Sequence, residues 1–263
     1  MARSIVVTSG KGGVGKSTVT VALGRELCRR NLRVALVDTD IGLNNLDVLL
    51  DMEHRVVYDI LDVVKNRCRV RQALVEDNST GGLFLLPSAH AYEAGEITAQ
   101  NIRLIVNSLS SSFDFVLIDC PAGVELGFHR AVAAAKEALV VTTPHVSAVR
   151  DASKVIPILQ SYGLSSRVVV NRSRGDLVMD SEMADSVGIA DALGCGIAGV
   201  IPEDDYINLQ SNVIPVRRRK SDGLTAIEVL AQNVMYGTET VYDVTKRYRG
   251  IFGAFKRGLR KLV

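Results

Sequence analysis

The chain has 263 residues, 47% hydrophobic and 23% charged, with no Pro-, Gly- or Ser-rich linker, which excludes a largely disordered protein and predicts one sizeable domain. The formal net charge is +2, but seven basic residues and no acid lie in residues 246–263, which leaves residues 1–245 at −5. We find no secretory-signal pattern, no apolar run of the roughly 20 residues that span a bilayer, and no C-x-x-C pair. We therefore expect a cytosolic protein with reduced thiols at Cys28, Cys68, Cys120 and Cys195.

Strand-like and helix-like segments alternate along the chain. The predicted strands are Ser4–Thr8, Arg33–Val37, Leu83–Leu86, Asp114–Ile118, Ala138–Thr142, Arg167–Val170 and Gly196–Ile201. The predicted helices are Thr18–Arg30, Val56–Val64, Ala99–Leu109, Ser147–Gln160, Met183–Leu193 and Leu224–Val244. This alternation predicts an α/β fold with a mainly parallel, doubly wound sheet that has helices on both faces. Ligands of such sheets bind beyond the carboxyl ends of the strands.

A phosphate-binding loop follows the first predicted strand. The segment Gly10-Lys11-Gly12-Gly13-Val14-Gly15-Lys16-Ser17 fits the pattern G-x-x-x-x-G-K-[ST]. Its glycines let successive backbone N–H groups point at an anion, and the helix that follows adds the positive end of its dipole. Lys16 is placed to reach the β- and γ-phosphates, and the Ser17 hydroxyl to ligate Mg²⁺. Lys11 is a second lysine that the basic pattern does not require.

Acidic and amide side chains stand at the ends of three later strands. Asp38 and Asp40 follow the second strand, Asp119 ends a hydrophobic strand as a Walker-B aspartate does, and Asn171 follows another strand. Asp119 is expected to hold Mg²⁺ directly or through water. Because the chain must turn at Gly42, Asp38 and Asp40 can have separate roles, one in the metal shell and one in orienting the attacking water.

Three motifs together resemble one family. The phosphate loop with its extra Lys11, Asp38-Thr39-Asp40-Ile41-Gly42 and Asp119-Cys120-Pro121-Ala122-Gly123 are similar to the motifs of the deviant-Walker-A ATPases, the ParA/MinD family. The resemblance runs from Ala2 to the end of the chain and is greatest to the MinD group. It implies an ATPase that hydrolyses ATP with Mg²⁺, forms a homodimer with ATP and attaches peripherally to the cytoplasmic face of the inner membrane. There it would position the division site by recruiting a MinC-like inhibitor, and a MinE-like activator would stimulate it.

The resemblance also implies roles for single residues. Lys11 would contact the phosphates in the partner subunit of an ATP dimer, Lys16 the β/γ-phosphate oxygens, and Asp40 the attacking water. The implied metal-binding residues are Ser17, Asp38, Asp40 and Asp119. The implied nucleotide-binding residues are Gly10, Lys11, Gly12, Gly13, Val14, Gly15, Lys16, Ser17, Thr18, Asn171 and Pro202, with Asn171 reading the adenine and Pro202 beside it. Arg150 and Asp151 are expected contacts for the protein partners.

The basic C-terminal segment carries an apolar stripe. At steps of three and four residues it places Tyr248, Ile251, Phe252, Phe255, Leu259 and Leu262. These positions cover about 120° of a helical wheel, with most basic residues on the other side, which is typical of a helix lying in a membrane interface. We therefore predict an ATPase domain over residues 1–247 and an amphipathic membrane-targeting helix over residues 248–263.

Other interpretations stay open at this point. A tail docked on its own core would leave the dense basic face unexplained, and a nucleic-acid arm would leave the phenylalanines unexplained. For the whole chain the alternatives are a FlhG-type regulator of flagellar placement and a ParA-like DNA-partition ATPase, although we expect no nucleic-acid partner. The basic loop Arg217-Arg218-Arg219-Lys220 is either a solvated turn or a contact to an anionic surface.

Overall fold

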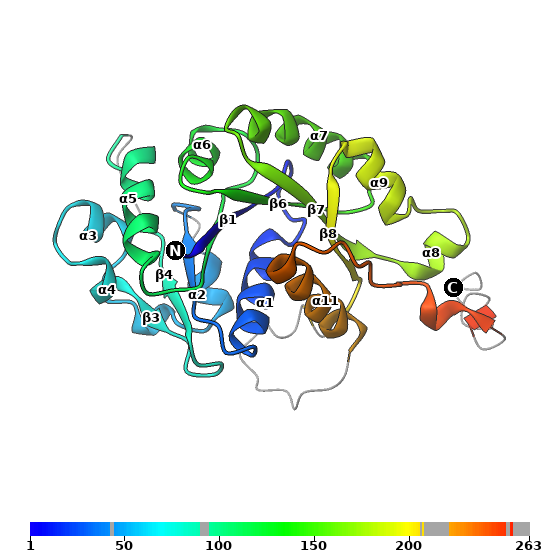
Figure 1. Ribbon diagram of the computed structural model, residues 1–263, viewed down its shortest axis with the longest axis horizontal. Coiled ribbons are helices and arrows are strands. Elements are labelled where there is room, and N and C mark those ends of the chain that lie inside the picture. The colour runs from blue at the N-terminus through cyan, green and yellow to red at the C-terminus, as the bar shows by residue number, and fades with distance from the viewer. Residues whose placement is uncertain (43–44, 90–94, 206, 208–220, 251–252, 255–263) are drawn as a thin grey trace.

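One eight-stranded sheet organises the computed structural model, which describes residues 1–42, 45–89, 95–205, 207, 221–250 and 253–254 (Figure 1). The strands are β1 (Arg3–Thr8), β2 (Val34–Asp38), β3 (Val75–Glu76), β4 (Leu83–Leu86), β5 (Phe115–Asp119), β6 (Glu137–Thr142), β7 (Ser165–Ser173) and β8 (Gly196–Pro202). Their order is β3-β4-β2-β5-β1-β6-β7-β8, and every pairing is parallel except the antiparallel pair of β3 with β4. The predicted α/β fold with a mainly parallel sheet is confirmed.

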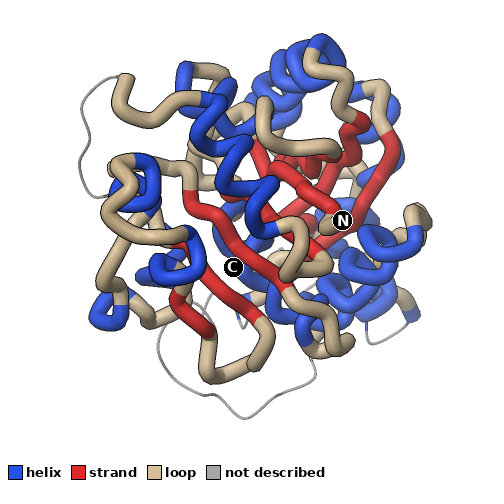
Figure 2. Tube along the Cα trace, turned by 60° about the vertical axis from the view of Figure 1, so that its left-hand side comes forward, coloured by secondary structure: helices blue, strands red, loops and turns tan. Residues whose placement is uncertain are grey.

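Helices cover both faces of the sheet. They are α1 (Lys16–Cys28), α2 (Asn45–Leu49), α3 (Ile60–Val64), α4 (Val70–Ala73), α5 (Ala99–Leu109), α6 (Leu126–Val132), α7 (Val146–Ser161), α8 (Gly175–Met179), α9 (Ser186–Leu193) and α11 (Asp222–Tyr236). Two short 3₁₀ turns, η1 (Glu53–Arg55) and η2 (Lys246–Tyr248), complete the described elements. Helices α5, α6, α7 and α9 lie on one face, and α1 and α11 on the other, as Figures 1 and 2 show.

Two hydrophobic cores result from the two-residue period of the strands. In β1, Val6 packs into the core under α5, α6, α7 and α9, whereas Ile5 and Val7 pack into the core under α1 and α11. Side chains of a strand alternate between the faces of the sheet, so a strand buried on both faces must be apolar throughout. This explains why the predicted strands read as continuous apolar runs.

All seven predicted strands are present, but the last predicted helix is too long. The prediction over Leu224–Val244 is wrong beyond Tyr236, where α11 ends. Gly237 adopts a left-handed conformation with a φ of 70°, which closes the helix as a C-terminal cap. The prediction also misses β3, because a strand of two residues leaves no periodicity in the sequence.

Two other predicted helices begin later than expected. Those over Val56–Val64 and Met183–Leu193 start only after Asp59 and Asp185, whose side chains accept hydrogen bonds from the backbone of the first turn. Such caps fix the first helical residue, and the apolar residues before them belong to connecting loops. The four cysteines are free, as expected.

The C-terminal segment is described only at its root. Tyr248 is half-buried at the end of η2, while Ile251, Phe252, Phe255, Leu259 and Leu262 lie outside the described residues, as does the basic loop Arg217–Lys220. Within the described ranges, we find no helix that combines the length and apolarity needed to cross a bilayer.

Candidate functional site

The phosphate loop joins β1 to α1, and two of its glycines are required by close packing. A Cβ atom on Gly10 would lie 2.2 Å from the backbone of Asp151 in α7, and one on Gly15 would lie 2.4 Å from Nδ2 of Asn171. Gly15 also has a φ of 90° and is the residue before the first turn of α1, which no side chain caps. The first N–H groups of α1 are therefore directed at the loop, which is the arrangement that binds phosphate at helix N-termini.

Asp119 is the centre of the site. Its side chain is completely buried at the end of β5, and its Oδ2 accepts hydrogen bonds from the Ser17 hydroxyl at 2.7 Å and from Nζ of Lys16 at 3.1 Å. Its Oδ1 lies 3.0 Å from the hydroxyl of Thr20, one turn into α1. Burial by itself would lower the pKa of Lys16, but Asp119, together with Cys120 and Asp40, more than offsets this and the pKa lies above its usual value. Lys16 and Asp119 thus form a buried ion pair.

Asp38 lies beside Asp119, because the two are paired in register at the ends of β2 and β5. Burial, reinforced by the charge of Asp119, raises the pKa of Asp38 to about 7. Its two oxygens accept the backbone N–H groups of Asp40 at 2.9 Å and Leu46 at 3.2 Å. Asp38 therefore holds the start of the loop that follows β2.

Asp40 is half-buried and faces a different environment from Asp38. The chain turns after it at Gly42, which has a φ of 95°, as the sequence predicts. Burial raises the pKa of Asp40, with Lys16 acting against the shift and Asp119 adding to it. Its Oδ2 accepts a hydrogen bond of 3.3 Å from the amide of Asn45. A carboxylate oriented in this way, at the rim of the site, is suited to orienting a water molecule.

Lys11 is exposed on the outer side of the loop. Its Nζ donates a hydrogen bond of 3.1 Å to the hydroxyl of Ser147, at the start of α7. It also lines a groove of about 590 Å³ whose other cations are Arg172 and Arg174. Lys11 is thus separated from Lys16, which points inward at Asp119, and the two lysines serve different sides of the loop.

Asn171 and Pro202 meet at the ends of β7 and β8. They border a small cavity of about 10 Å³ next to Gly15 and Thr18. Nδ2 of Asn171 donates a 2.8 Å hydrogen bond to the carbonyl of Val14, which ties β7 to the phosphate loop. The residues predicted to flank a base are therefore brought together beside those predicted to bind phosphate.

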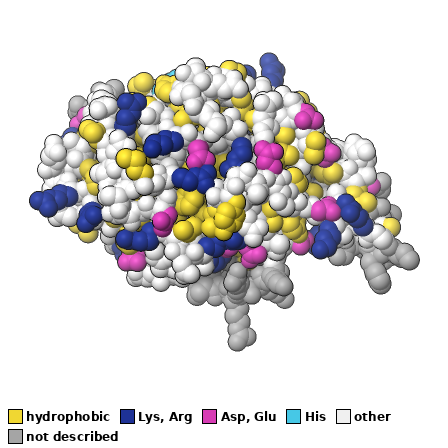
Figure 3. Space-filling view, viewed as in Figure 1, with side chains coloured by type: hydrophobic (Ala, Val, Ile, Leu, Met, Phe, Trp, Pro, Cys, Tyr) yellow, Lys and Arg dark blue, Asp and Glu magenta, His cyan; other side chains and the backbone are white. Residues whose placement is uncertain are grey.

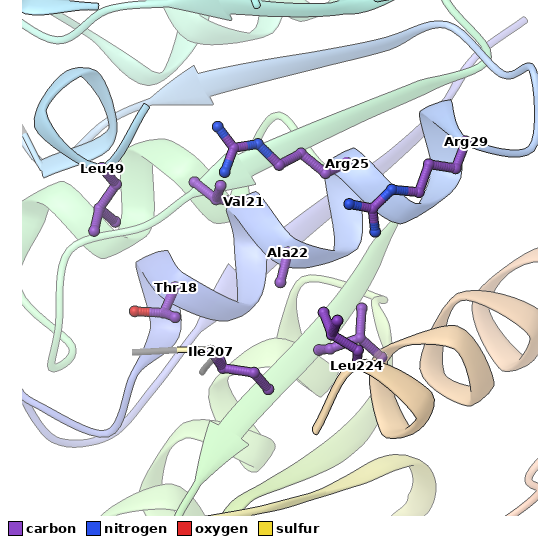
Figure 4. Close-up of a pocket in the computed structure, with 9 residues that line it drawn as sticks. Thr18, Val21, Ala22, Arg25, Arg29, Leu49, Ile207 and Leu224 are labelled. Atoms are coloured by element: carbon purple, nitrogen blue, oxygen red, sulfur yellow. The ribbon is translucent and has the colours of Figure 1, made fainter. Parts of the chain in front are cut away.

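A separate, apolar pocket lies on the outer side of α1, away from the carboxylates. Figure 4 shows it between α1 and the start of α11, with Val21, Ala22 and Leu224 in its walls. The arginines at its rim, Arg25 and Arg29, are paired with Asp77 and Glu26. It therefore takes no part in the arrangement around Asp119.

The residues around Asp119 fit a magnesium ion that is shared with a nucleotide. The described residues contain no group of three or more His, Cys, Asp or Glu side chains placed to hold a metal alone. Mg²⁺ in nucleotide sites uses one or two protein ligands, and phosphate oxygens and water complete its shell. The hydroxyl of Ser17 and the carboxylate of Asp119, 2.7 Å apart, are oxygen ligands of that kind.

The structure brings the predicted residues together at this place, and three further side chains contact them. Thr20, Asn45 and Ser147 contact Asp119, Asp40 and Lys11, respectively. Asn45 lies three residues after the Asp38–Gly42 motif and Ser147 is the first residue of a predicted helix, so the sequence points to both positions. Thr20 carries no signal beyond its position one turn after Lys16 in the predicted helix.

The chain is similar to proteins of one group. The ParA family model, described as NUBPL iron-transfer P-loop NTPase, matches residues 1–178. The putative septum site-determining protein MinD of Guillardia theta is 46% identical over 81% of this chain and 79% of that protein. The septum site-determining protein MinD of Synechocystis sp. is 45% identical over 81% of this chain and 80% of its own length.

Solved structures give the same result. The MinD cell division protein of Aquifex aeolicus superposes with a TM-score of 0.82 at 37% identity, covering 91% of this chain and 99% of that one. A MinC:MinD complex from the same organism matches with a TM-score of 0.80 at 38% identity, covering 91% and 97%. MinD of Pyrococcus horikoshii, solved with Mg-ADP, matches with a TM-score of 0.80 at 29% identity, covering 90% and 97%.

Proposed function

The chain belongs to the MinD group of septum site-determining ATPases within the ParA family, and we propose that it uses ATP binding to dimerise and attach to the membrane. It is a Mg-dependent ATPase of division-site selection. The observation that carries the chemistry is the contact of Lys16, Ser17 and Thr20 with one carboxylate, that of the buried Asp119. This arrangement places a cation and two hydroxyls beside the phosphate loop.

Each residue of the site then has a defined task. The loop and the N-terminus of α1 bind the phosphates, and Lys16 turns from Asp119 toward the β/γ-phosphate oxygens. Ser17 and Asp119 would hold Mg²⁺, with Asp38 supporting its shell, and the ion would supply positive charge against the phosphates. Asp40, held by Asn45, orients the attacking water. Asn171 and Pro202 flank the base.

We assign Lys11 to the phosphates of a second subunit. Its support is the exposed position of Lys11 on the outer side of the loop, where it donates to the hydroxyl of Ser147 and forms no salt bridge with a described carboxylate, although its charge acts on Asp151. An exposed cation without a direct ion pair is easily released to a phosphate. The Lys11→Ala variant should retain nucleotide binding but stay monomeric with ATP in sedimentation velocity. An ATP-dependent dimer of normal stability would contradict the assignment.

The C-terminal segment, residues 248–263, is proposed to attach the dimer to the cytoplasmic face of the inner membrane. Its stripe of apolar residues and its five basic residues fit an anionic lipid surface. One such segment binds marginally, whereas two on a dimer gain roughly 10²–10⁴ in avidity. ATP should therefore increase sedimentation with anionic liposomes, and Phe252→Glu with Phe255→Glu should abolish it. Sedimentation that survives both substitutions would refute insertion.

The protein partners follow from the relatives. A MinD of Aquifex aeolicus forms a complex with MinC, and we propose a MinC-like inhibitor as a partner of this chain, with a MinE-like activator as a second. Arg150 and Asp151 near the start of α7 are the proposed contacts. Charge reversal at Arg150 should weaken MinC binding in surface plasmon resonance and leave ATP binding unchanged. Unchanged MinC affinity would remove Arg150 from the interface.

A further inference from the structure

A groove rimmed by arginines lies far from the nucleotide site, between α3–α4 and the end of α5. Its volume is about 530 Å³, its floor includes Val63, Val70, Leu109 and Phe113, and Arg69 and Arg71 stand at its rim. In Figure 1, α3 and α4 lie at the left end of the molecule, whereas η2, the root of the C-terminal segment, lies at the right end.

Two arginines at the rim form no ion pair with a described residue, although Asp59 and Asp62 lie close to Cys68 in the groove lining. In the segment 65–71, Arg67, Arg69 and Arg71 are exposed, while the residues between them are partly buried. Arg67 is paired with Asp62, but Arg69 and Arg71 form no ion pair with any described residue. Lysine and arginine side chains are also exposed at this end in Figure 3. Because residues 1–245 carry a net charge of −5, this is a local exception on an acidic body.

Both the rim and the floor are held in place. Nη2 of Arg71 donates a 2.8 Å hydrogen bond to the hydroxyl of Ser112. The ring of Phe113 packs edge to face with Phe84, with centroids 5.4 Å apart, and the guanidinium of Arg33 lies 5.2 Å from its centroid. Arg33 is exposed and adds a third cation near the groove. A preformed site loses less conformational entropy when a ligand binds.

We propose that this groove binds an acidic segment of a partner protein, with an apolar side chain seated on the floor and flanking carboxylates on Arg69 and Arg71. The positive charge of the rim favours an acidic partner, and the apolar floor favours an apolar side chain as its anchor. A lipid surface is disfavoured because it is flat and the groove is recessed between α3–α4 and the end of α5. A nucleic-acid duplex is disfavoured because its backbone has nothing to place on Val70 and Phe113.

The groove is independent of the nucleotide site. Phe113 precedes β5 and Asp119 ends it, so the two residues lie about 20 Å apart along the strand. A partner in the groove thus leaves the phosphate loop and the proposed dimer face accessible. The inference goes beyond the ATP cycle and does not depend on it.

The test uses fluorescence anisotropy of the full chain with labelled nine-residue peptides that carry a central leucine. One peptide flanks the leucine with glutamates and the other with glutamines. The glutamate peptide should bind at least tenfold more tightly, and Arg69→Glu with Arg71→Glu should weaken it at least tenfold. Arg69→Lys with Arg71→Lys should retain binding, and so should Lys136→Glu, which reverses an exposed charge elsewhere. Melting temperature and ATPase rate establish that each variant is folded.

Hydrogen–deuterium exchange locates the peptide. Protection on binding should be confined to residues 60–73 and 104–113. The proposal is overturned if the glutamate peptide shows no saturable binding at 1 mM, or if the doubly reversed variant binds it as the wild type does. It is also overturned if anionic vesicles or duplex DNA, rather than the peptide, protect these residues.

Discussion

The hydroxyl of Thr20 offers the sharpest test of how the site is held together. It lies 3.0 Å from Oδ1 of Asp119 and also 3.0 Å from the carbonyl of Lys16, and it has one proton to donate. Both Thr20 and Asp119 are fully buried, so water cannot replace the bond. If the proton goes to the carboxylate, its loss costs about 1.5–3 kcal/mol, the range for hydrogen bonds to charged groups. If it goes to the helical carbonyl, the cost is about 1 kcal/mol or less.

Thr20→Val separates these outcomes because valine has almost the same shape and leaves no cavity. We expect the carboxylate bond, and hence a decrease in melting temperature of about 3–12 °C for the nucleotide-free protein in EDTA. The concentration of Mg²⁺ that half-saturates the ATPase should also rise, because one oxygen of Asp119 is released from its constraint. Thr20→Ser restores the hydroxyl and should recover most of both properties. A loss below about 1 kcal/mol, or an equally damaged serine variant, would refute this account of Asp119.

Three further predictions concern other parts of the chain. Because the pKa of Asp38 is about 7 when folded, without Mg²⁺, and near 4 when unfolded, its ionisation costs stability as the pH rises through this window. The free energy of unfolding of Asp38→Asn, measured with urea relative to the wild type, should therefore be about 3 kcal/mol higher at pH 8 than at pH 5. The same variant-to-wild-type difference at both pH values would be inconsistent with this. Gly15→Ala should abolish ATP binding in calorimetry, because its Cβ would meet Asn171. Gly13→Ala has open space around its Cβ and should lose only about 1–2 kcal/mol of stability. Equal effects of the two substitutions would contradict the packing argument. Asn233→Ala should lower the free energy of unfolding by about 2–4 kcal/mol and expose residues 238–249 to proteolysis, because this fully buried amide makes four hydrogen bonds. Resistance to proteolysis equal to that of the wild type would argue against this.

The sequence predicts the parts of this molecule that depend on local pattern. Buried strands are apolar throughout, and a parallel sheet brings their ends together, so Asp38 and Asp119 could be expected side by side, as their register confirms. The C-terminus of α11 was also predictable, because a glycine such as Gly237 commonly ends a helix. The contact of Thr20 with Asp119 was not, because it depends on how α1 is rotated over the sheet.

The proposed nucleotide-binding roles rest on the family and on these geometries, whereas the proposed membrane attachment rests on the sequence pattern of residues 248–263 and on the family. The resemblance alone points to Lys11, but only the structure shows that its partner is the hydroxyl of Ser147. The arginine-rimmed groove could not be found from the sequence, because Arg69 and Phe113 are distant along the chain and meet only through the packing of α4 against α5.

Gly10 of the phosphate loop packs directly against the backbone of Asp151 in α7, so the loop and the helix are in close contact. No side chain lies between the phosphate loop and the backbone of α7 at this point, since even a Cβ atom would lie 2.2 Å from it. Because protein interiors have low compressibility and transmit strain, a loop that tightens on a phosphate is expected to displace the start of α7 with it. The same helix carries Val146, whose side chain is 85% exposed at its first residue. We therefore expect phosphate binding at the loop to shift the exposed Val146 at the start of α7.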